Sequence, residues 1–175
     1  MIIRDNILKI MEIFFSYPEK KFHMREIERM TKLSLPGVRD NLKKLEKENL
    51  VISSQNKIMK NYFALRSDKF TALKRSYNLY SLFTSGFIDF LRNIYEEPEA
   101  IILFGSYSKG EDNSTSDIDI AVISRKELEP NVSKFEKILK RRINIMETNL
   151  KKSEPEFLNS LTNGIVLYGF LRVMK

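Results

Sequence analysis

Residues 103–123, with the sequence LFGSYSKGEDNSTSDIDIAVI, decide the fold of the second half of this chain. They begin inside an apolar run, Ala100–Phe104, that has the length and composition of a buried strand. Residues 117–123 then alternate in polarity with a period of two, which predicts another strand. Because side chains two positions apart in a strand share a face, Asp117 and Asp119 are expected to point the same way.

The residues between these two predicted strands suit the binding of a polyphosphate. Gly105 follows the first strand directly and lets the backbone approach a ligand closely, and Ser106 is placed to begin a helix. Free N–H groups at the start of a helix, together with a serine hydroxyl, are hydrogen-bond donors for phosphate oxygens. Asp117 and Asp119 supply the hard oxygen ligands that Mg²⁺ prefers. The sequence therefore predicts adjoining phosphate and metal sites.

The motif resembles the signature of the nucleotidyltransferase superfamily that includes DNA polymerase beta, and especially its minimal prokaryotic members. That signature joins Gly-Ser, a short helix, a Gly and a Ser-Asp-x-Asp strand in this order. The resemblance covers about residues 100–169 and implies that the chain binds a nucleoside triphosphate and up to two Mg²⁺ ions. It implies transfer of a nucleoside monophosphate to an acceptor hydroxyl, which in some relatives belongs to a protein. The residues it assigns to nucleotide binding are Gly105, Ser106, Lys109, Gly110 and Ser116.

One position departs from the family pattern. The resemblance implies catalytic residues at Asp117, Asp119 and a third carboxylate on a neighbouring strand, but the matching position is Asn144 in Ile-Asn-Ile-Met. An amide carbonyl ligates a metal weakly, adds no negative charge and cannot act as a base. Glu147 is the nearest carboxylate, but it is out of phase with Asn144 on a strand, so only a bulge could turn it to the same side. A milder departure is Lys109, where the family commonly has Arg.

The rest of this region predicts a mixed α+β domain over residues 99–175, a small sheet flanked by helices. Helical patterning covers residues 129–142, and residues 143–146 form a short apolar strand pattern. Pro155 starts a further helix, Gly164 ends it, and a last strand is expected over residues 165–168.

The first 68 residues predict a separate domain. Apolar residues at helical spacing indicate a first helix that ends before Pro18, a second helix beginning at His23 and a third that Ser34 caps. Two strands are expected over residues 50–53 and 62–65, with a polar loop between them. Three helices followed by a hairpin resemble the winged helix-turn-helix family.

That resemblance implies contact with double-stranded DNA. The third helix carries basic residues that could reach a major groove, and the hairpin loop carries lysines for the phosphate backbone. The residues predicted to contact DNA are Ser34, Arg39, Lys43, Lys44, Lys47, Lys57 and Lys60. Charge agrees with a polyanionic partner, because residues 1–68 hold 14 Lys and Arg against 9 Asp and Glu, within a total charge of +7. A solvated helix face and loop explain the same residues, so this alternative stays open.

Residues 69–98 predict one long linker helix rich in aromatic residues, with Pro98 at its end. Its apolar residues cover more than one stripe, so several sides must be buried. The helix is expected to pack between the two domains or against a second subunit of a homodimer, and packing within one chain explains the pattern equally well.

Composition limits the other function classes. The chain has no cysteine, which excludes disulfides and thiolate metal sites, and its single histidine disfavours His-based catalysis. The apolar segments are interrupted by charges, which predicts no signal peptide and no membrane span. A cytoplasmic, prokaryotic protein is the expected setting.

Three functions remain open. The first is a magnesium-dependent transferase with a DNA-binding domain. The second is a DNA-binding transcriptional regulator whose degenerate nucleotidyltransferase domain senses a nucleotide without turning it over, which Asn144 favours. The third is a docking or dimerisation protein without catalysis.

Overall fold

The computed structural model describes residues 5–55, 59–148 and 154–171, and they form two compact units. The first unit spans Met1–Lys74 and the second Arg75–Lys175. Both contain helices and a small sheet, so the chain is of the mixed α+β class predicted from the sequence. The part of the chain that the structure describes has no helix long and apolar enough to cross a membrane.

The N-terminal unit contains three helices and a three-stranded antiparallel sheet of order β1-β3-β2. Ser34 caps the third helix, because its hydroxyl accepts a hydrogen bond from the Gly37 N–H at 3.3 Å. Strand β1 was not predicted, since two residues are too few to produce a periodic pattern. The elements of this unit are α1 (Asn6–Ser16), β1 (Phe22–His23), α2 (Met24–Thr31), α3 (Leu35–Lys47), β2 (Val51–Gln55) and β3 (Lys60–Ala64).

The single long helix predicted over residues 69–98 is wrong, because the structure has two helices there, α4 (Asp68–Thr84) and α5 (Phe87–Ile94). They are separated at Gly86, whose φ of 76° lies in the left-handed region that glycine adopts without strain. The boundary between the two units falls within α4, between Lys74 and Arg75. Residues 75–98 therefore belong to the C-terminal unit.

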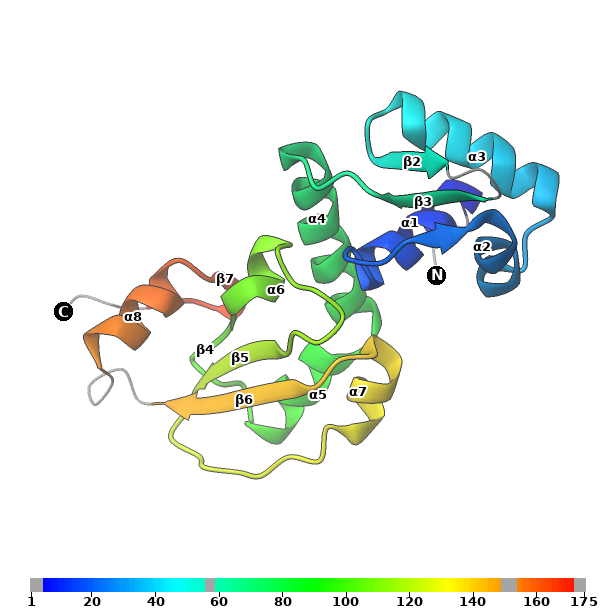
Figure 1. The fold of residues 1–175 in the computed structure, drawn as a ribbon. Helices are drawn as coiled ribbons and strands as arrows, with labels where there is room; N and C mark the ends of the chain where they lie inside the picture. The colour runs from blue at the N-terminus through cyan, green and yellow to red at the C-terminus, as the bar shows by residue number, and fades with distance from the viewer. Residues whose placement is uncertain (1–4, 56–58, 149–153, 172–175) are drawn as a thin grey trace. The chain divides into compact units, whose positions relative to one another are not determined.

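The C-terminal unit is built on a four-stranded sheet of order β6-β5-β4-β7 (Figure 1). Strands β5 and β6 run parallel, and the other neighbours are antiparallel. The remaining elements of this unit are β4 (Ala100–Phe104), α6 (Gly105–Lys109), β5 (Ile118–Ile123), α7 (Ser133–Leu139), β6 (Ile143–Thr148), α8 (Pro155–Thr162) and β7 (Ile165–Gly169).

Helices cover both faces of this sheet and leave one corner open. Leu91 of α5 and Phe135 of α7 pack against the face that carries Ile120. Leu161 of α8 packs against the opposite face, which carries Ile102 and Ala121. Asp119 has the same parity as Ala121 along β5, so it lies on the α8 face of the sheet, near the start of the strand.

Helix α7 is shorter than the helix predicted over residues 129–142. Pro130 disfavours helical backbone at the residue before it, and Asn131 accepts a hydrogen bond from the Ser133 N–H at 3.1 Å, which fixes a later start. Lys140 adopts a left-handed conformation with φ of 55°, and this ends the helix. Residues 140–142 are thereby freed to lead into β6.

Candidate functional site

The turn from β4 into α6 requires glycine at residue 105 for two reasons. Gly105 has a φ of 72°, in the left-handed region, and a Cβ placed there would lie only 2.4 Å from Oδ2 of Asp119. The backbone at Gly105 is therefore in direct reach of the Asp119 carboxylate. A ligand held by this turn would lie beside that carboxylate.

Helix α6 is a single tight turn. The Ser108 hydroxyl donates to the Gly105 carbonyl at 2.7 Å, and Gly110 ends the helix with φ of 75°. Five residues make a small helix dipole, so the turn can offer a phosphate its individual N–H groups rather than a strong helix field. Ser106 is half-buried at its start, and Lys109 is exposed at its last residue.

Asp119 and Asn144 are partners across the parallel strands β5 and β6. The Asn144 amide donates to Oδ1 of Asp119 at 3.2 Å, so both side chains lie on the same face. Asp117 is exposed, and it comes directly before β5 on the same side as Asp119. The structure therefore brings Asp119 and Asn144 together next to Gly105, and Asp117 lies two residues before Asp119 in the chain.

Glu147 is directed to the other face of the sheet. Its carboxylate accepts hydrogen bonds from the Tyr95 hydroxyl and from the Leu128 N–H at 2.7 Å. Burial and the neighbouring Glu147 carboxylate raise the pKa of Tyr95, which keeps the phenol protonated as the donor. Pairing of β5 with β6 is continuous from Ile118–Ile143 to Ile123–Thr148, a stretch that the structure describes in full, so no bulge turns Glu147 toward Asp119.

The oxygen ligands next to Gly105 suit one hard divalent cation, and they carry less negative charge than a set of three carboxylates would. Asp117 and Asp119 supply two carboxylates, and Asn144 supplies an amide whose oxygen is a weak ligand. No group of three or more His, Cys, Asp or Glu side chains is placed to hold a metal among the residues with described positions. Two acidic residues fit a Mg²⁺ ion that draws its remaining ligands from phosphate oxygens and water.

A buried polar network supports the strands that carry this corner. Asp112, in the loop before β5, lies 3.8 Å from the guanidinium of Arg141, and the two side chains are 1 % and 7 % exposed. The Asn78 amide of α4 donates to Asp112 at 2.8 Å and to the Tyr107 carbonyl at 2.9 Å. Asp112 therefore ties the loop that leads to Asp117 to α4 and to the turn before β6, and Asn78 ties α4 to α6.

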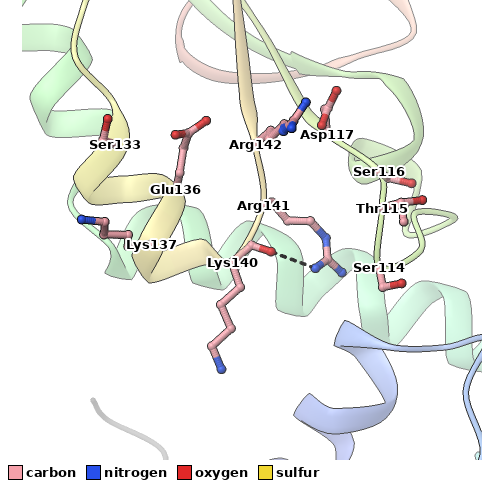
Figure 2. Close-up of a pocket in the computed structure, with 10 residues that line it drawn as sticks. All are labelled: Ser114, Thr115, Ser116, Asp117, Ser133, Glu136, Lys137, Lys140, Arg141 and Arg142. Carbon is pink, nitrogen blue, oxygen red and sulfur yellow. Dashed lines mark hydrogen bonds between the residues drawn. The ribbon is translucent and has the colours of Figure 1, made fainter.

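A pocket of about 960 Å³ adjoins the metal-ligand candidates (Figure 2). It lies between the loop before β5, the helix α7 and the turn that leads into β6. Asp117 is part of its lining, whereas Asp119, Gly105 and Ser106 are not. Its lining residues are Ser114, Thr115, Ser116, Asp117, Ser133, Glu136, Lys137, Lys140, Arg141 and Arg142.

Ser116, which the sequence assigns to nucleotide binding together with Gly105, lines this pocket, whereas Gly105 does not. Its hydroxyl accepts a hydrogen bond from the Asn113 N–H at 3.0 Å, which stabilises the loop that leads to Asp117. The structure supports a loop-forming contact for Ser116.

The basic residues predicted to contact DNA lie on the N-terminal unit. Arg39, Lys43, Lys44 and Lys47 are all exposed on α3. Lys60 is 3.5 Å from Glu46 and stacks over the Tyr62 ring at 5.0 Å, so part of its charge is already paired. Lys57 lies outside the described residues.

Sequence reasoning missed Asp112 and Asn78. Asp112 is separated from Arg141 by 29 positions and from Asn78 by 34, so no local period links them. The only available signal was the acidic pair Glu111-Asp112 in a loop that otherwise contains uncharged polar residues.

Comparison with known proteins supports one part of the chain. No curated protein matches it. Residues 87–170 match the family model described as Polymerase beta, Nucleotidyltransferase. This segment starts at the first residue of α5 and ends one residue after β7, so it contains the sheet, the Gly105 turn and Asp117, Asp119 and Asn144. Residues 87–170 are therefore similar to the nucleotidyltransferase domains of the polymerase beta family.

Proposed function

We propose that the C-terminal unit binds a magnesium–nucleoside triphosphate and transfers its nucleoside monophosphate to an acceptor hydroxyl, at a rate limited by Asn144. The observation that carries this proposal is the convergence of Asp119 and Asn144 across two strands beside a turn that only glycine fits.

Each residue has a separate task in this reaction. The Gly105–Ser106 turn donates N–H and hydroxyl groups to the phosphates, and Asp117 and Asp119 hold the cation. A Mg²⁺ ion held by these carboxylates would supply positive charge to offset that of the phosphates. The acceptor oxygen forms a bond to the α-phosphorus, the bond from that phosphorus to the β-phosphate oxygen breaks, and pyrophosphate leaves.

Asn144 explains why turnover is expected to be slow. In this proposal Asp117 and Asp119 are engaged by the cation, the Asn144 amide cannot accept a proton, and the Glu147 carboxylate lies on the other face of the sheet. The proton of the acceptor hydroxyl therefore passes to water. A positioned general base contributes about 10²–10⁴-fold to a rate. The same chain would therefore bind nucleotide well and release pyrophosphate slowly, which also suits a nucleotide sensor.

The test compares the wild-type chain with Asp119→Ala. Calorimetric titration with each of the four nucleoside triphosphates in Mg²⁺ should give metal-dependent binding that weakens more than about tenfold in the variant. Asp89→Ala removes an exposed aspartate of α5 and should leave binding unchanged. Equal binding by wild type and Asp119→Ala would contradict the proposed site.

A second function, DNA binding by the N-terminal unit, is favoured by its topology. Three helices, a sheet of order β1-β3-β2 and an exposed basic face on α3 agree with a winged helix-turn-helix domain. Its α3 would enter the major groove with Arg39 and Lys43 toward the DNA.

Salt dependence tests this second function. The double variant Arg39→Ala/Lys43→Ala should weaken duplex binding. It should also reduce the slope of log K against log salt by about 0.9 for each of the two residues that contacts a phosphate. Arg66→Ala, an exposed arginine between β3 and α4, is the matched control. Unchanged slope and affinity in the double variant would assign duplex binding, if any, to another surface.

A further inference from the structure

The lining of the pocket beside Asp117 contains four basic residues and two acidic ones. Arg141 is paired with the buried Asp112 and lines the pocket. Lys137, Lys140 and Arg142 line the pocket as well, and among the described residues none of the three forms an ion pair. The two lining acids are Asp117 and Glu136, and Glu136 accepts a hydrogen bond from the Ile143 N–H at 3.0 Å.

The opposite wall of the pocket is rich in hydroxyl groups. Ser114, Thr115 and Ser116 follow one another in the loop before Asp117, and Figure 2 shows them across the pocket from α7. Lysine and arginine side chains and hydroxyl groups are the hydrogen-bond donors that phosphate oxygens accept. The volume of about 960 Å³ is large enough for more than an isolated ion.

The pocket lies on a different side of the metal-ligand candidates from the Gly105 turn. Gly105 is in contact range of Asp119, whereas the pocket is lined by Asp117 and by Arg142, which comes two residues before Asn144. In an in-line displacement, the attacking and leaving oxygens lie on opposite sides of the phosphorus. If the nucleoside triphosphate binds at Gly105, the pocket therefore lies on the side from which the acceptor attacks.

We propose that this pocket, through Lys137, Lys140 and Arg142, binds phosphate groups of a phosphorylated acceptor. The identity of the ligand as an acceptor rests on the proposed transferase function, whereas its phosphate chemistry follows from the pocket. The sources of such phosphates are a single nucleic-acid strand, whose last phosphodiester lies close to its terminal hydroxyl, or a small phosphorylated molecule.

The test measures binding without transfer. A short fluorescein-labelled single-stranded oligonucleotide is titrated into the full chain in EDTA and without a nucleoside triphosphate. The double variant Lys137→Ala/Lys140→Ala should bind at least about tenfold more weakly, with a salt slope smaller by about 1.4, since each contact to a single strand contributes about 0.7. Lys134→Ala is the matched control, because this exposed lysine of α7 does not line the pocket.

Competition then separates the two sources. If inorganic pyrophosphate displaces the strand at concentrations similar to those at which the strand itself binds, the pocket binds a small phosphorylated ligand. Weak competition, with affinity that rises with strand length, would support a nucleic-acid strand. Unchanged affinity and salt slope in the double variant, or an equal loss in Lys134→Ala, would overturn the proposal. Because metal and triphosphate are absent, a failure of nucleotide binding at Asp119 leaves this result interpretable.

Discussion

Replacing Asn144 with aspartate is expected to increase pyrophosphate release by about a hundredfold. The structure pairs Asn144 with Asp119 across β5 and β6, so a carboxylate at this position would join Asp117 and Asp119, the two proposed acidic metal ligands, without any backbone change. It would add a negative charge for the cation and a group able to accept the proton of the acceptor hydroxyl.

Thermal unfolding gives a readout of the same variant that does not depend on an acceptor. Without metal, Asn144→Asp replaces the 3.2 Å hydrogen bond from the Asn144 amide to Asp119 with repulsion between two carboxylates. The C-terminal unit should therefore lose stability. Mg²⁺ should restore that stability, and the metal-induced rise in Tm should be larger than in the wild type.

Asn131→Asp is the control for this charge change. Asn131 is exposed and accepts a hydrogen bond from the Ser133 N–H, and aspartate can keep that bond. If Asn144→Asp changes neither the Mg²⁺-induced Tm rise nor pyrophosphate release relative to Asn131→Asp, Asn144 does not occupy the third-ligand position.

The local parts of the site could be predicted from the sequence because their signals are local. The alternation through Asp117, Asp119 and Ala121 places both aspartates on one face, and the strand phase of Glu147 against Asn144 predicts opposite faces. The structure has both arrangements, with the Glu147 carboxylate engaged by Tyr95 on the far face.

The remaining features depend on contacts between distant residues, which periodicity does not record. One continuous helix was predicted through Gly86, with at most a bend there, because apolar residues continue on both sides of it, and α5 uses them to cover the sheet. The pocket beside Asp117 depends on where α7 ends, and the left-handed Lys140 that ends it has no sequence signal of its own. The buried pair Asp112–Arg141 depends on the folded sheet.

Removing the Asp112 carboxylate is expected to lower the free energy of unfolding of the C-terminal unit by about 3–5 kcal/mol, because it leaves a buried guanidinium without this counter-charge. Asp112→Ala also removes the acceptor for the Asn78 amide. The Arg92–Asp89 pair is a matched control: its atoms are 3.9 Å apart, against 3.8 Å for Arg141–Asp112, but its aspartate is 76 % exposed. Asp89→Ala should change stability by less than about 0.5 kcal/mol.

Burial, rather than distance, should therefore decide the difference between these two ion pairs. Urea unfolding followed by hydrogen exchange of the peptides that contain β4 and β5 reports the C-terminal unit separately from the N-terminal one. The double variant Asp112→Leu/Arg141→Met removes both charges together and should be less destabilised than Asp112→Ala, since no unpaired ion remains inside. If the losses of unfolding free energy in Asp112→Leu and Arg141→Met instead added up to the loss in the double variant, Asp112 would act through its hydrogen bond to Asn78 and not through Arg141. In that case the loop leading to Asp117 would be tied to α4 alone, and Arg141→Met by itself should leave nucleotide binding intact.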